Sequence, residues 1–461
     1  MLEEKKFLFE LNNKEKISKI VVQSFEKKTN SYELLLPGSK SFSNRAIVLA
    51  GMNPLPTKIK GILFSDDSYW GLNSLEKLGF KLEIDYTNAE VTIIPPAVKF
   101  LQKVDLYFGK AGTLARFFPA VLLNWQRTFH KSSQLIANIN ADPQLIRRPI
   151  TPLIYALNQL GANIQDSQLP TILKSCLLQG ECEISGNISG QFLSGLLLAA
   201  AGSKSKCKIK RIENLVQPDY VKMTIAAIEK FGVQVNYDHE LTAFEIQNKD
   251  GFQFNDYTVE ADASTSCYFV ALAFLHNFDL KIMNLGSNTL QPDYKFMHIL
   301  QMLGANIEIY PDKTIVNKRP VNLKPKGNFE FDFSFLSDQA LTLGVIGLFA
   351  DSPITVKGVA HIRHHESDRI SCFVKNVREL GLKIEEFPDG FTIYPIENTS
   401  LVGKGCFATW EDHRFAMSGF ILCSLLNSVT LLNPKCVEKT APKFFQQMQS
   451  IGFNIIESSG D

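Results

Sequence analysis

The stretch LEKLGFKLEI (Leu75–Ile84) joins the end of an amphipathic helix to an alternating strand through a Leu-Gly pair. Glycine just past a helix adopts the left-handed conformation without the steric cost of a Cβ. After Gly79, the apolar residues Phe80, Leu82 and Ile84 alternate with polar ones, which is the period of a half-buried strand. This stretch predicts a helix–glycine–strand junction, which is a common feature of α/β proteins.

The same junction returns five times along the chain. The further copies are LNQLGANIQ around Gly161, IEKFGVQVNY around Gly232, LQMLGANIEIY around Gly304, VRELGLKIEEF around Gly381 and MQSIGFNIIES around Gly452. The glycines lie between 71 and 82 residues apart, so the copies account for nearly the whole chain. Such regular spacing is hard to obtain by chance, and it predicts a sixfold α/β repeat.

We expect the repeats to form two lobes of three. The chain crosses between the lobes near LLLPGSKSFSNRA (Leu34–Ala46) and YTVEADASTSCYFVALA (Tyr257–Ala273), where an extended segment meets a helix start. One lobe then holds residues 1–37 and 262–461, and the other holds residues 38–261. The weakly patterned first thirty residues are expected to add a strand or a helix to one lobe.

Composition excludes several classes of protein. The 461 residues include 48 Lys+Arg against 47 Asp+Glu, a formal net charge of +1, with 45% apolar and 21% charged residues. This is globular composition, and near-neutrality argues against a broad nucleic-acid surface but not against a local basic pocket. The longest apolar stretches, such as Phe192–Ala201, are about half the roughly 20 residues of a membrane span.

Cysteine usage and the N-terminus indicate the compartment. The eight cysteines are scattered without a CxxC pair, which is typical of buried free thiols in a reducing compartment. The N-terminal stretch MLEEKKFLFELNNKEK lacks the pattern of a signal or transit peptide. We therefore expect a cytoplasmic protein that binds neither nucleic acid nor membrane.

Three segments place cations or glycines at helix starts in the first half of the chain. In LPGSKSFSNRA, Ser39, Ser41 and Ser43 can cap a helix whose free N–H groups favour an anion, and Lys40 and Arg45 add charge. This segment resembles but does not match a Walker A loop. The alternative is a capped surface helix with incidental cations.

The other two segments have the same character. FGKAGTLARFFPA puts a glycine-rich turn at Gly112 before a helix, with Arg116 one turn in. In IRRPITPLIYALNQLG, Arg147 and Arg148 precede Pro149, a favourable first helical residue. Because arginine at a helix start opposes the dipole, an anionic ligand is one reason to keep it there, and simple exposure is the other.

The second half repeats the pattern. HIRHHESDRI carries Glu366 and Arg369, ATWEDHRFAM carries Asp412, His413 and Arg414, and NPKCVEKTAP carries Lys439. Asp338 opens an apolar helix and is either its N-cap or a site residue. His413, between an acid and a base at a helix start, is a candidate functional histidine.

Together these segments resemble the 3-phosphoshikimate 1-carboxyvinyltransferase (EPSP synthase) family. The likeness covers nearly the full chain beyond the first thirty residues and rests on LPGSKSFSNRA, KAGTLAR, RRP, SGNISGQFLSGLL, EADASTSCYF, the DQA and ESDR segments, DHRFAM and PKCVEKT. It implies a two-lobed inside-out α/β barrel of six βαβαββ repeats, three per lobe, with the active site between the lobes. The related enolpyruvyl transferase acting on UDP-N-acetylglucosamine fits worse, because its cysteine-bearing loop has no counterpart.

The resemblance also implies an activity. Family members transfer the enolpyruvyl group of phosphoenolpyruvate to the 5-hydroxyl of shikimate 3-phosphate and release phosphate, in the shikimate pathway to chorismate and aromatic amino acids. They use no metal or organic cofactor and act as monomers. Addition at C2 with protonation at C3 gives a tetrahedral adduct that then expels phosphate, so cations and proton-moving groups are needed.

By similarity, each candidate residue takes a role. The catalytic set is Lys40, Asp338, Glu366 and His413. The phosphoenolpyruvate set is Lys40, Gly112, Arg116, Arg148, Gln191, Arg369, Arg414 and Lys439. The acceptor set is Ser41, Arg45, Ser189, Gln191, Gln217, Tyr220, Asp338 and His365. Glu366 would protonate and later deprotonate the methylene carbon, with Lys40 also handling protons, and Asp338 would accept or orient the attacking hydroxyl.

The acceptor side departs from the family pattern. Gly190 and Gln217 stand where serines are usual, His365 replaces an expected lysine, and His361 and Lys110 replace common asparagines. Losing one charge-assisted hydrogen bond costs about 1.5–3 kcal/mol, so three such changes matter unless they are compensated.

Three interpretations of these departures stay open. The chain is a divergent EPSP synthase, an enolpyruvyl transferase for another cyclic alcohol with altered or absent phosphate, or a non-catalytic anion-binding homologue. We favour the first, because the match runs over the full length. Retention of Lys40, Glu366 and Asp338 argues against the last, because binding alone does not need both carboxylates.

Overall fold

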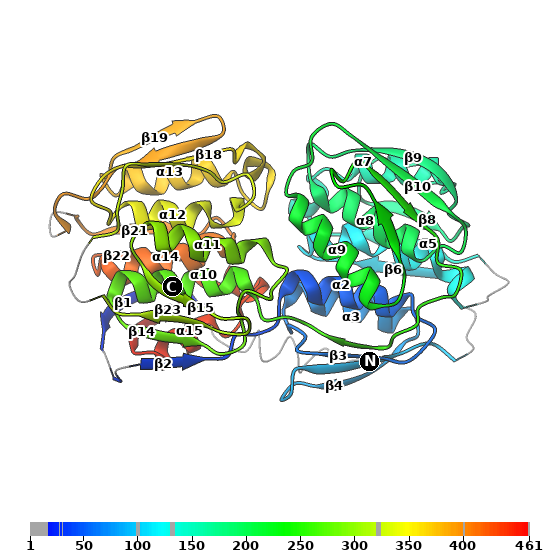
Figure 1. The fold of residues 1–461 in the computed structure, drawn as a ribbon, viewed down its shortest axis with the longest axis horizontal. Coiled ribbons are helices and arrows are strands. Elements are labelled where there is room, and N and C mark those ends of the chain that lie inside the picture. The colour runs from blue at the N-terminus through cyan, green and yellow to red at the C-terminus, as the bar shows by residue number, and fades with distance from the viewer. Residues whose placement is uncertain are drawn as a thin grey trace. The chain divides into compact units, whose positions relative to one another are not determined.

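The computed structural model of the chain describes residues 17–26, 28–29, 31–97, 102–129, 134–319, 324–399 and 402–459. The chain divides into two compact units (Figure 1). The middle unit is Pro37–Glu260, and the terminal unit combines the segment that ends at Leu36 with the segment that begins at Ala261. Both units are built from strands and helices, which confirms the α/β fold class.

The middle unit contains eight helices and eleven strands among its described residues. The helices are α2 (Lys40–Gly51), α3 (Asp66–Lys77), α4 (Gly112–Phe117), α5 (Pro119–Thr128), α6 (Pro143–Ile146), α7 (Thr151–Gln159), α8 (Gly190–Ala201) and α9 (Pro218–Lys230). The strands are β3 (Thr57–Lys60), β4 (Lys81–Asp85), β5 (Glu90–Ile94), β6 (Lys103–Tyr107), β7 (Ile136–Asn140), β8 (Thr171–Lys174), β9 (Gly180–Ser185), β10 (Cys207–Ile212), β11 (Val235–Tyr237), β12 (Ala243–Ile246) and β13 (Asp256–Thr258).

The terminal unit holds strands from both ends of the chain. Its strands are β1 (Ile17–Phe25), β2 (Ser31–Leu34), β14 (Asp279–Ile282), β15 (Asn306–Ile309), β16 (Thr314–Asn317), β17 (Phe329–Asp332), β18 (Ile354–Lys357), β19 (Ile384–Phe387), β20 (Gly390–Ile393), β21 (Gly405–Ala408), β22 (Val429–Leu432) and β23 (Phe453–Ser459). Its α-helices are α10 (Ala263–His276), α11 (Phe296–Met302), α12 (Ala340–Gly347), α13 (Arg369–Glu379), α14 (His413–Leu425) and α15 (Phe444–Ser450). Short 3₁₀ helices are η1 (Pro292–Lys295), η2 (Ser337–Gln339), η3 (Ala360–His364) and η5 (Pro434–Lys439).

One sheet pattern recurs in both units. In the sheet β9-β10-β12-β11, β9 runs parallel to β10, β10 antiparallel to β12, and β12 antiparallel to β11. The sheets β13-β3-β5-β4, β2-β14-β16-β15, β17-β18-β20-β19 and β21-β22-β1-β23 repeat this pairing, and β6-β7-β8 is a three-stranded version. These six sheets in the described residues accord with the six predicted repeats.

Three of the sheets take a strand from a distant part of the chain. β2 pairs with β14 in the terminal unit, although α2, the next helix, belongs to the middle unit. β13 reciprocally pairs with β3 in the middle unit before the chain enters α10 of the terminal unit. β1 lies between β22 and β23 and pairs antiparallel with both, so the described part of the first thirty residues adds a strand.

The repeat glycines adopt the predicted conformation. All six have positive φ, from +74° at Gly381 to +107° at Gly452. The junction at Gly161 departs from the prediction beyond the glycine, because residues 162–170 form no strand and β8 begins only at Thr171. The absence of a strand after Gly161 explains why the sheet β6-β7-β8 has three strands and not four.

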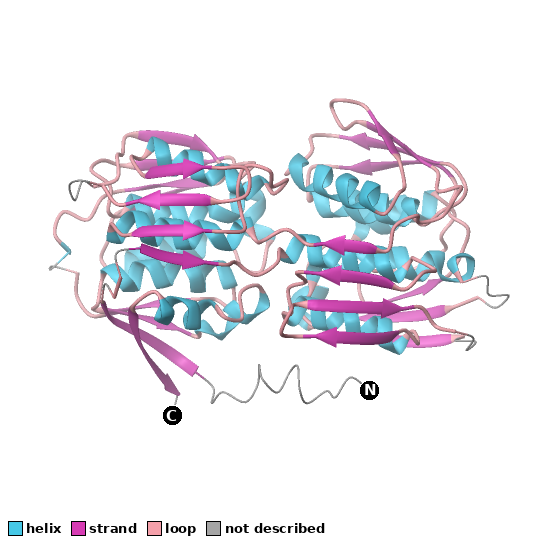
Figure 2. Ribbon diagram, turned by 60° about the horizontal axis from the view of Figure 1, so that its bottom comes forward, coloured by secondary structure: helices cyan, strands magenta, loops and turns pink. Residues whose placement is uncertain are grey.

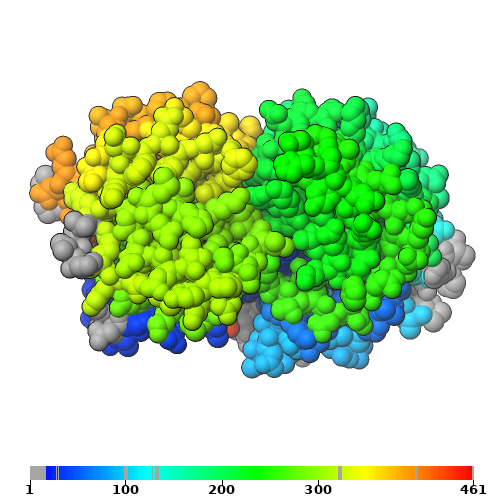
Figure 3. Space-filling view, in the orientation of Figure 1, coloured from blue at the N-terminus to red at the C-terminus, as the bar shows by residue number. Residues whose placement is uncertain are grey.

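Buried helices fill each unit, and the sheets lie against them (Figure 2). Every residue of α12 is buried, as are nearly all residues of α8 and α14. Side chains fill the surface of each unit in the space-filling view, so the spaces between ribbons are not openings (Figure 3). The buried helices therefore hold the segments that carry the candidate site residues, which lie in or beside these helices.

The cysteine prediction is confirmed in part. All eight cysteines are free, and Cys182, Cys207, Cys267 and Cys423 are buried. Cys406 is exposed, so the expectation that every thiol is buried is wrong for that residue. Among the described residues, none of the helices combines the length and the apolar character needed to span a bilayer.

Candidate functional site

The start of α2 presents Lys40 in the middle unit. Ser39 is the N-cap, and its Oγ accepts a hydrogen bond from the Phe42 N–H. Lys40 is the first residue of the helix, and its Nζ lies 3.8 Å from Asp67 Oδ2. Ser43, another predicted cap, lies inside the helix, where its Oγ accepts from the Leu63 N–H. Ser39 alone therefore caps α2.

Arg45 lies inside the middle unit. Its Nε donates to Thr224 Oγ1 at 2.8 Å, and its two terminal nitrogens donate to the carbonyls of Ser41 and Tyr220 at 2.8 and 2.9 Å. Burial lowers the pKa of Arg45 to about 10, which leaves it charged at neutral pH. These bonds tie α2 to α9, so the structure gives Arg45 a part in holding the predicted acceptor residues together.

Four predicted phosphoenolpyruvate residues meet around Gly112. The Arg116 guanidinium donates to Gln191 Oε1 at 2.7 Å and to the Pro149 carbonyl at 3.2 Å. A Cβ on Gly112 would lie 2.9 Å from an Arg148 guanidinium nitrogen and 3.5 Å from one of Arg116. Two arginines thus converge on the start of α4, where their planar forks suit an oxyanion.

The structure corrects the local prediction at Arg148. α7 begins at Thr151, with Pro152 in its first turn, so Pro149 is not the first helical residue. The Arg148 N–H instead donates to the Leu145 carbonyl at the end of α6. Arg148 is therefore placed by the turn after α6 and not by the start of α7.

The starts of α8 and α9 bring the predicted acceptor residues of the middle unit together. Ser189 caps α8, and its Oγ accepts from the Gln191 N–H at 3.3 Å. A Cβ on Gly190 would lie 2.7 Å from the Val216 carbonyl oxygen, closer than side chains approach. Gln217, the N-cap of α9, has a φ of 55°. The segment before α9 therefore packs directly on Gly190, which explains the absence of a serine there.

In the terminal unit, Arg369 joins three carboxylates. Its guanidinium lies 2.8 Å from Asp338 Oδ1, 3.0 Å from Glu366 Oε2 and 2.7 Å from Asp412 Oδ2. Arg369 is 2% exposed, and although burial opposes its charge, these carboxylates raise its pKa further. The first turn of α13 thus fixes a buried cation among acids from three other segments.

Two further cations complete this cluster. The Arg414 guanidinium lies 2.6 Å from Asp338 Oδ2, and Lys439 Nζ lies 2.7 Å from Glu366 Oε1. Burial alone would raise the pKa of Asp338, but Arg414 and Arg369 outweigh it and hold that pKa well below its usual range. Asp338 does not cap α12, whose N-cap is Gln339, so the N-cap alternative is wrong.

Histidines border the cluster. His365 Nδ1 lies 3.1 Å from Arg369, and the His361 Nε2 lies 2.9 Å from Ser337 Oγ. Because arginine only donates, this contact is a hydrogen bond when His365 Nδ1 accepts it. His413 is 2% exposed, and its Nδ1 lies 3.7 Å from Asp412 Oδ1. The predicted residues of the terminal unit are therefore all within one group of helix starts.

Three residues of these surroundings escaped sequence reasoning. Arg363 donates to Asp368, Glu386 and the Pro388 carbonyl, and thereby ties η3 to the start of α13. Asp67 is 1% exposed beside Lys40, and Ser337 holds His361. The signal for Asp67 was a Ser-Asp-Asp helix start after a strand, which by itself is common.

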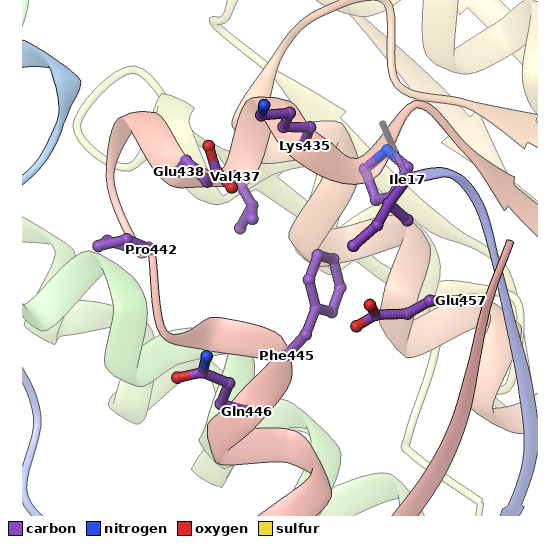
Figure 4. A pocket seen from close by; sticks show the side chains of 9 residues that line it. Ile17, Lys435, Val437, Glu438, Pro442, Phe445, Gln446 and Glu457 are labelled. Carbon is purple, nitrogen blue, oxygen red and sulfur yellow. The ribbon is translucent and has the colours of Figure 1, made fainter. Parts of the chain in front are cut away.

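Two pockets elsewhere contain none of the predicted site residues. One lies between η5, α15 and the first residue of β1, and encloses about 40 Å³ (Figure 4). It is lined by Lys435, Val437, Phe445 and Glu457, among others. The other is an open hollow on the sheet β9-β10-β12-β11, lined by Lys–Glu pairs such as Lys208 with Glu181. The first is too small for a sugar phosphate, and the second is solvated.

Known proteins match both the fold and the sequence. An EPSP synthase from Acinetobacter baumannii has a TM-score of 0.74 at 21% identity, covering 96% of this chain and 100% of its own. The enolpyruvyl transferase NikO from Streptomyces tendae has a TM-score of 0.73 at 12% identity, with the same coverage. The chain thus has the fold shared by the enolpyruvyl transferases.

Sequence comparison narrows this class. The family described as EPSP synthase (3-phosphoshikimate 1-carboxyvinyltransferase) matches residues 27–448. The 3-phosphoshikimate 1-carboxyvinyltransferase 2 of Halalkalibacterium halodurans is 35% identical over 432 residues, 92% of each chain. The Vibrio cholerae enzyme is 33% identical over 429 residues, 91% of this chain and 97% of its own. The chain belongs to the EPSP synthase family.

Proposed function

We propose that the chain transfers the enolpyruvyl group of phosphoenolpyruvate to the 5-hydroxyl of shikimate 3-phosphate and releases phosphate. The observation that carries this proposal is the buried cluster of Arg369, Arg414 and Lys439 with Asp338 and Glu366. Burying arginines and carboxylates so close together costs stability, because each charge must leave water. Groups with strongly perturbed surroundings cluster at functional sites, so we interpret this cluster as part of such a site. The family to which the chain belongs is described by this activity.

The terminal unit supplies the proton chemistry in this proposal. Glu366 donates a proton to the methylene carbon and later removes one. Its ion pair with Lys439, at 2.7 Å, favours the charged carboxylate. When a phosphoenolpyruvate anion takes over Lys439, Glu366 loses this cation and accepts a proton more readily. Binding thereby prepares the acid for the first step.

In this proposal Asp338 orients the acceptor hydroxyl. Arg369 and Arg414 hold both of its oxygens, at 2.8 and 2.6 Å, and keep it ionised. A carboxylate fixed in this way can accept a hydrogen bond from the hydroxyl and orient its oxygen for attack. The same arginines then stabilise the negative charge of the adduct.

The middle unit supplies the oxyanion ligands. Arg116, Arg148 and Gln191 meet at Gly112, and Lys40 begins α2. Helix starts favour anions through their free N–H groups. We propose that these groups hold the carboxylate or phosphate of phosphoenolpyruvate, while Ser41, Ser189 and Tyr220 contact the acceptor.

A second candidate function is transfer to a cyclic alcohol without the 3-phosphate. The packing of Val216 on Gly190 favours it, because no side chain at position 190 can contact a phosphate. His365 favours it too, since an imidazole, which is charged only when it is protonated, replaces a permanently charged lysine. The chain matches more than nine-tenths of the length of relatives named 3-phosphoshikimate 1-carboxyvinyltransferase, which favours the phosphorylated acceptor.

We also propose that the enzyme is a cytoplasmic monomer. Eight free cysteines are typical of a reducing compartment, which supports the location. Light scattering coupled to gel filtration tests the monomer, because a dimer would elute with twice the chain mass.

The experiment that tests the function is ³¹P NMR of the purified protein with phosphoenolpyruvate and shikimate 3-phosphate. We expect equal growth of inorganic phosphate and of one new phosphorylated product, with loss of both substrate signals. Phosphate release with unphosphorylated alcohols alone would support the second candidate. Silence with every acceptor would overturn both.

A further inference from the structure

Asp67 is a buried carboxylate that the proposed mechanism does not use. It lies in the first turn of α3, is 1% exposed, and its Oδ2 lies 3.8 Å from Lys40 Nζ. The Asn44 Nδ2 donates to the same oxygen at 3.5 Å. Asn44 and Lys40 belong to α2, which packs against α3. A carboxylate in the first turn of α3 therefore lies close to an ammonium at the start of α2.

This carboxylate is poorly satisfied for a buried charge. Among the described residues, no donor lies within hydrogen-bond distance of Asp67 Oδ1. Asn44 Oδ1 is likewise buried without a hydrogen bond in that part of the chain. A buried charge with incomplete hydrogen bonding costs stability, and an amide of the same shape would avoid most of that cost. Structural need alone does not account for Asp67.

Lys40 gives the reason for the charge. As the first residue of α2, its ammonium meets the positive end of the helix dipole, which disfavours a cation there. An opposite charge within about 4–6 Å favours the charged form of a side chain and fixes its position. Asp67 lies at the start of its own helix, where the dipole stabilises an anion. The two helix starts thus suit a carboxylate that restrains an ammonium.

We infer that Asp67 is a positioning residue that holds the Lys40 ammonium, protonated, at the start of α2. The inference rests on the proposed function, because it takes Lys40 as part of the transfer machinery. At 3.8 Å the two charges do not form a short direct hydrogen bond. Asp67 therefore restrains the ammonium through charge attraction at this distance.

The test compares Asp67→Asn with Asp66→Asn. Asp66 is the preceding residue of α3 and accepts from Trp70 Nε1 at 3.2 Å. For D67N we expect kcat to fall about tenfold or more, with the alkaline limb of its pH profile about one unit lower. We expect D66N to keep the wild-type kcat and limb. Asp67→Glu should restore part of kcat.

Two readouts separate positioning from structure. The thermal midpoint of D67N should equal or exceed that of the wild type, because a poorly bonded buried charge is removed. Acetylation of Lys40 by acetic anhydride, measured by mass spectrometry, should be faster in D67N. We expect the rate to rise about tenfold for each unit by which the variant lowers the pKa of Lys40. D66N should acetylate at the wild-type rate.

The outcomes are decisive in both directions. A D67N enzyme with the wild-type kcat, pH profile and acetylation rate overturns the inference. So does lost activity that accompanies a lower thermal midpoint and an unchanged acetylation rate, because that is a folding effect. If the wild type itself lacks transferase activity, the proposed function fails, while faster acetylation of Lys40 in D67N still supports the restraint by Asp67.

Discussion

Arg369 shows how one side chain can organise half of a site. Its five N–H groups meet Asp338 and Asp412 from distant stretches of sequence, and His365 and Glu366 from the turn just before its own helix. A lysine has one ammonium and cannot form these planar pairs. The identity of residue 369 therefore matters more than its charge.

The variant Arg369→Lys tests this dependence. Breaking a buried ion pair costs about 3–5 kcal/mol, so the free energy of unfolding should fall and kcat/KM should drop about a hundredfold or more. Urea unfolding and steady-state kinetics measure both. The matched control is Arg378→Lys, an exposed residue near the other end of α13, which should change neither. Equal effects of the two variants would contradict the account.

Gly190→Ser tests whether the family's usual serine fits this chain. The new Cβ would lie 2.7 Å from the Val216 carbonyl oxygen, so the segment before α9 must shift. Overpacking of this kind costs about 1–3 kcal/mol, and we expect a lower thermal midpoint with no decrease in KM for shikimate 3-phosphate. An unchanged thermal midpoint with a lower KM would contradict this expectation, because it would show that a serine at position 190 fits and improves binding of the acceptor.

At the scale of the element, the recurring unit is a helix closed by a left-handed glycine. The sequence pattern predicted all six glycines, because the residue type and the conformation are linked locally. It failed after Gly161, where the alternation of Ala162–Gln165 forms no strand, because pairing depends on neighbours distant in sequence. It also misplaced a helix start at Pro149, because α7 begins at Thr151 and Pro152 lies in its first turn.

Two glycines of the terminal unit separate conformational from steric cost. Gly381 has a φ of +74° and open space at its Cβ position. Gly381→Ala should therefore lower the free energy of unfolding by about 1 kcal/mol, the cost of a left-handed alanine. In Gly390→Ala the Cβ would lie 1.9 Å from the Val356 carbonyl oxygen, so the loss should be larger. Urea denaturation of both variants gives the comparison, and the reverse order would contradict it.

His276, the last residue of α10, should make the stability of the protein sensitive to acid. Burial lowers the pKa of His276 from 6.5 to about 4. Unfolded histidine binds a proton below about pH 6.5, so this contribution to stability is complete above that pH and is lost as the pH falls towards 4. His361, whose pKa burial also lowers to about 4, acts in the same window. Chemical denaturation between pH 7 and 4.5 gives the free energy of unfolding at each pH. We expect it to fall less steeply with decreasing pH in His276→Gln than in the wild type, and an identical slope would exclude His276 as a cause of the acid sensitivity.

At the scale of the whole molecule, the terminal unit is not one run of sequence, whereas the described residues of the middle unit form the single stretch Pro37–Glu260. β1 and β2 from the N-terminal region complete sheets whose other strands come after residue 278, and β13 completes a sheet begun at β3. The terminal unit therefore cannot complete its sheets without β1 and β2. The ion pairs of Asp338 with Arg369 and Arg414 join residues far apart in the sequence, so they could not be predicted without the tertiary structure.

Val21→Pro tests the part played by β1. Val21 pairs with Thr430 on one side and Ile456 on the other. Proline in the middle of a sheet removes a ladder hydrogen bond, and we expect the free energy of unfolding to fall by about 1–3 kcal/mol for the partner left without its bond. Val21→Thr, which keeps the hydrogen bond and the branched shape, is the control. Equal stability of the two variants would show that β1 is dispensable.

The choice of acceptor is the central claim. The most direct measurement is kcat/KM for shikimate 3-phosphate and for shikimate at a saturating phosphoenolpyruvate concentration, with phosphate release as the readout. We predict saturable turnover with shikimate 3-phosphate and a kcat/KM for shikimate lower by about a hundredfold or more, because one lost charged contact costs about 1.5–3 kcal/mol and a phosphate makes several. Equal or faster turnover of the unphosphorylated alcohol would contradict the assignment.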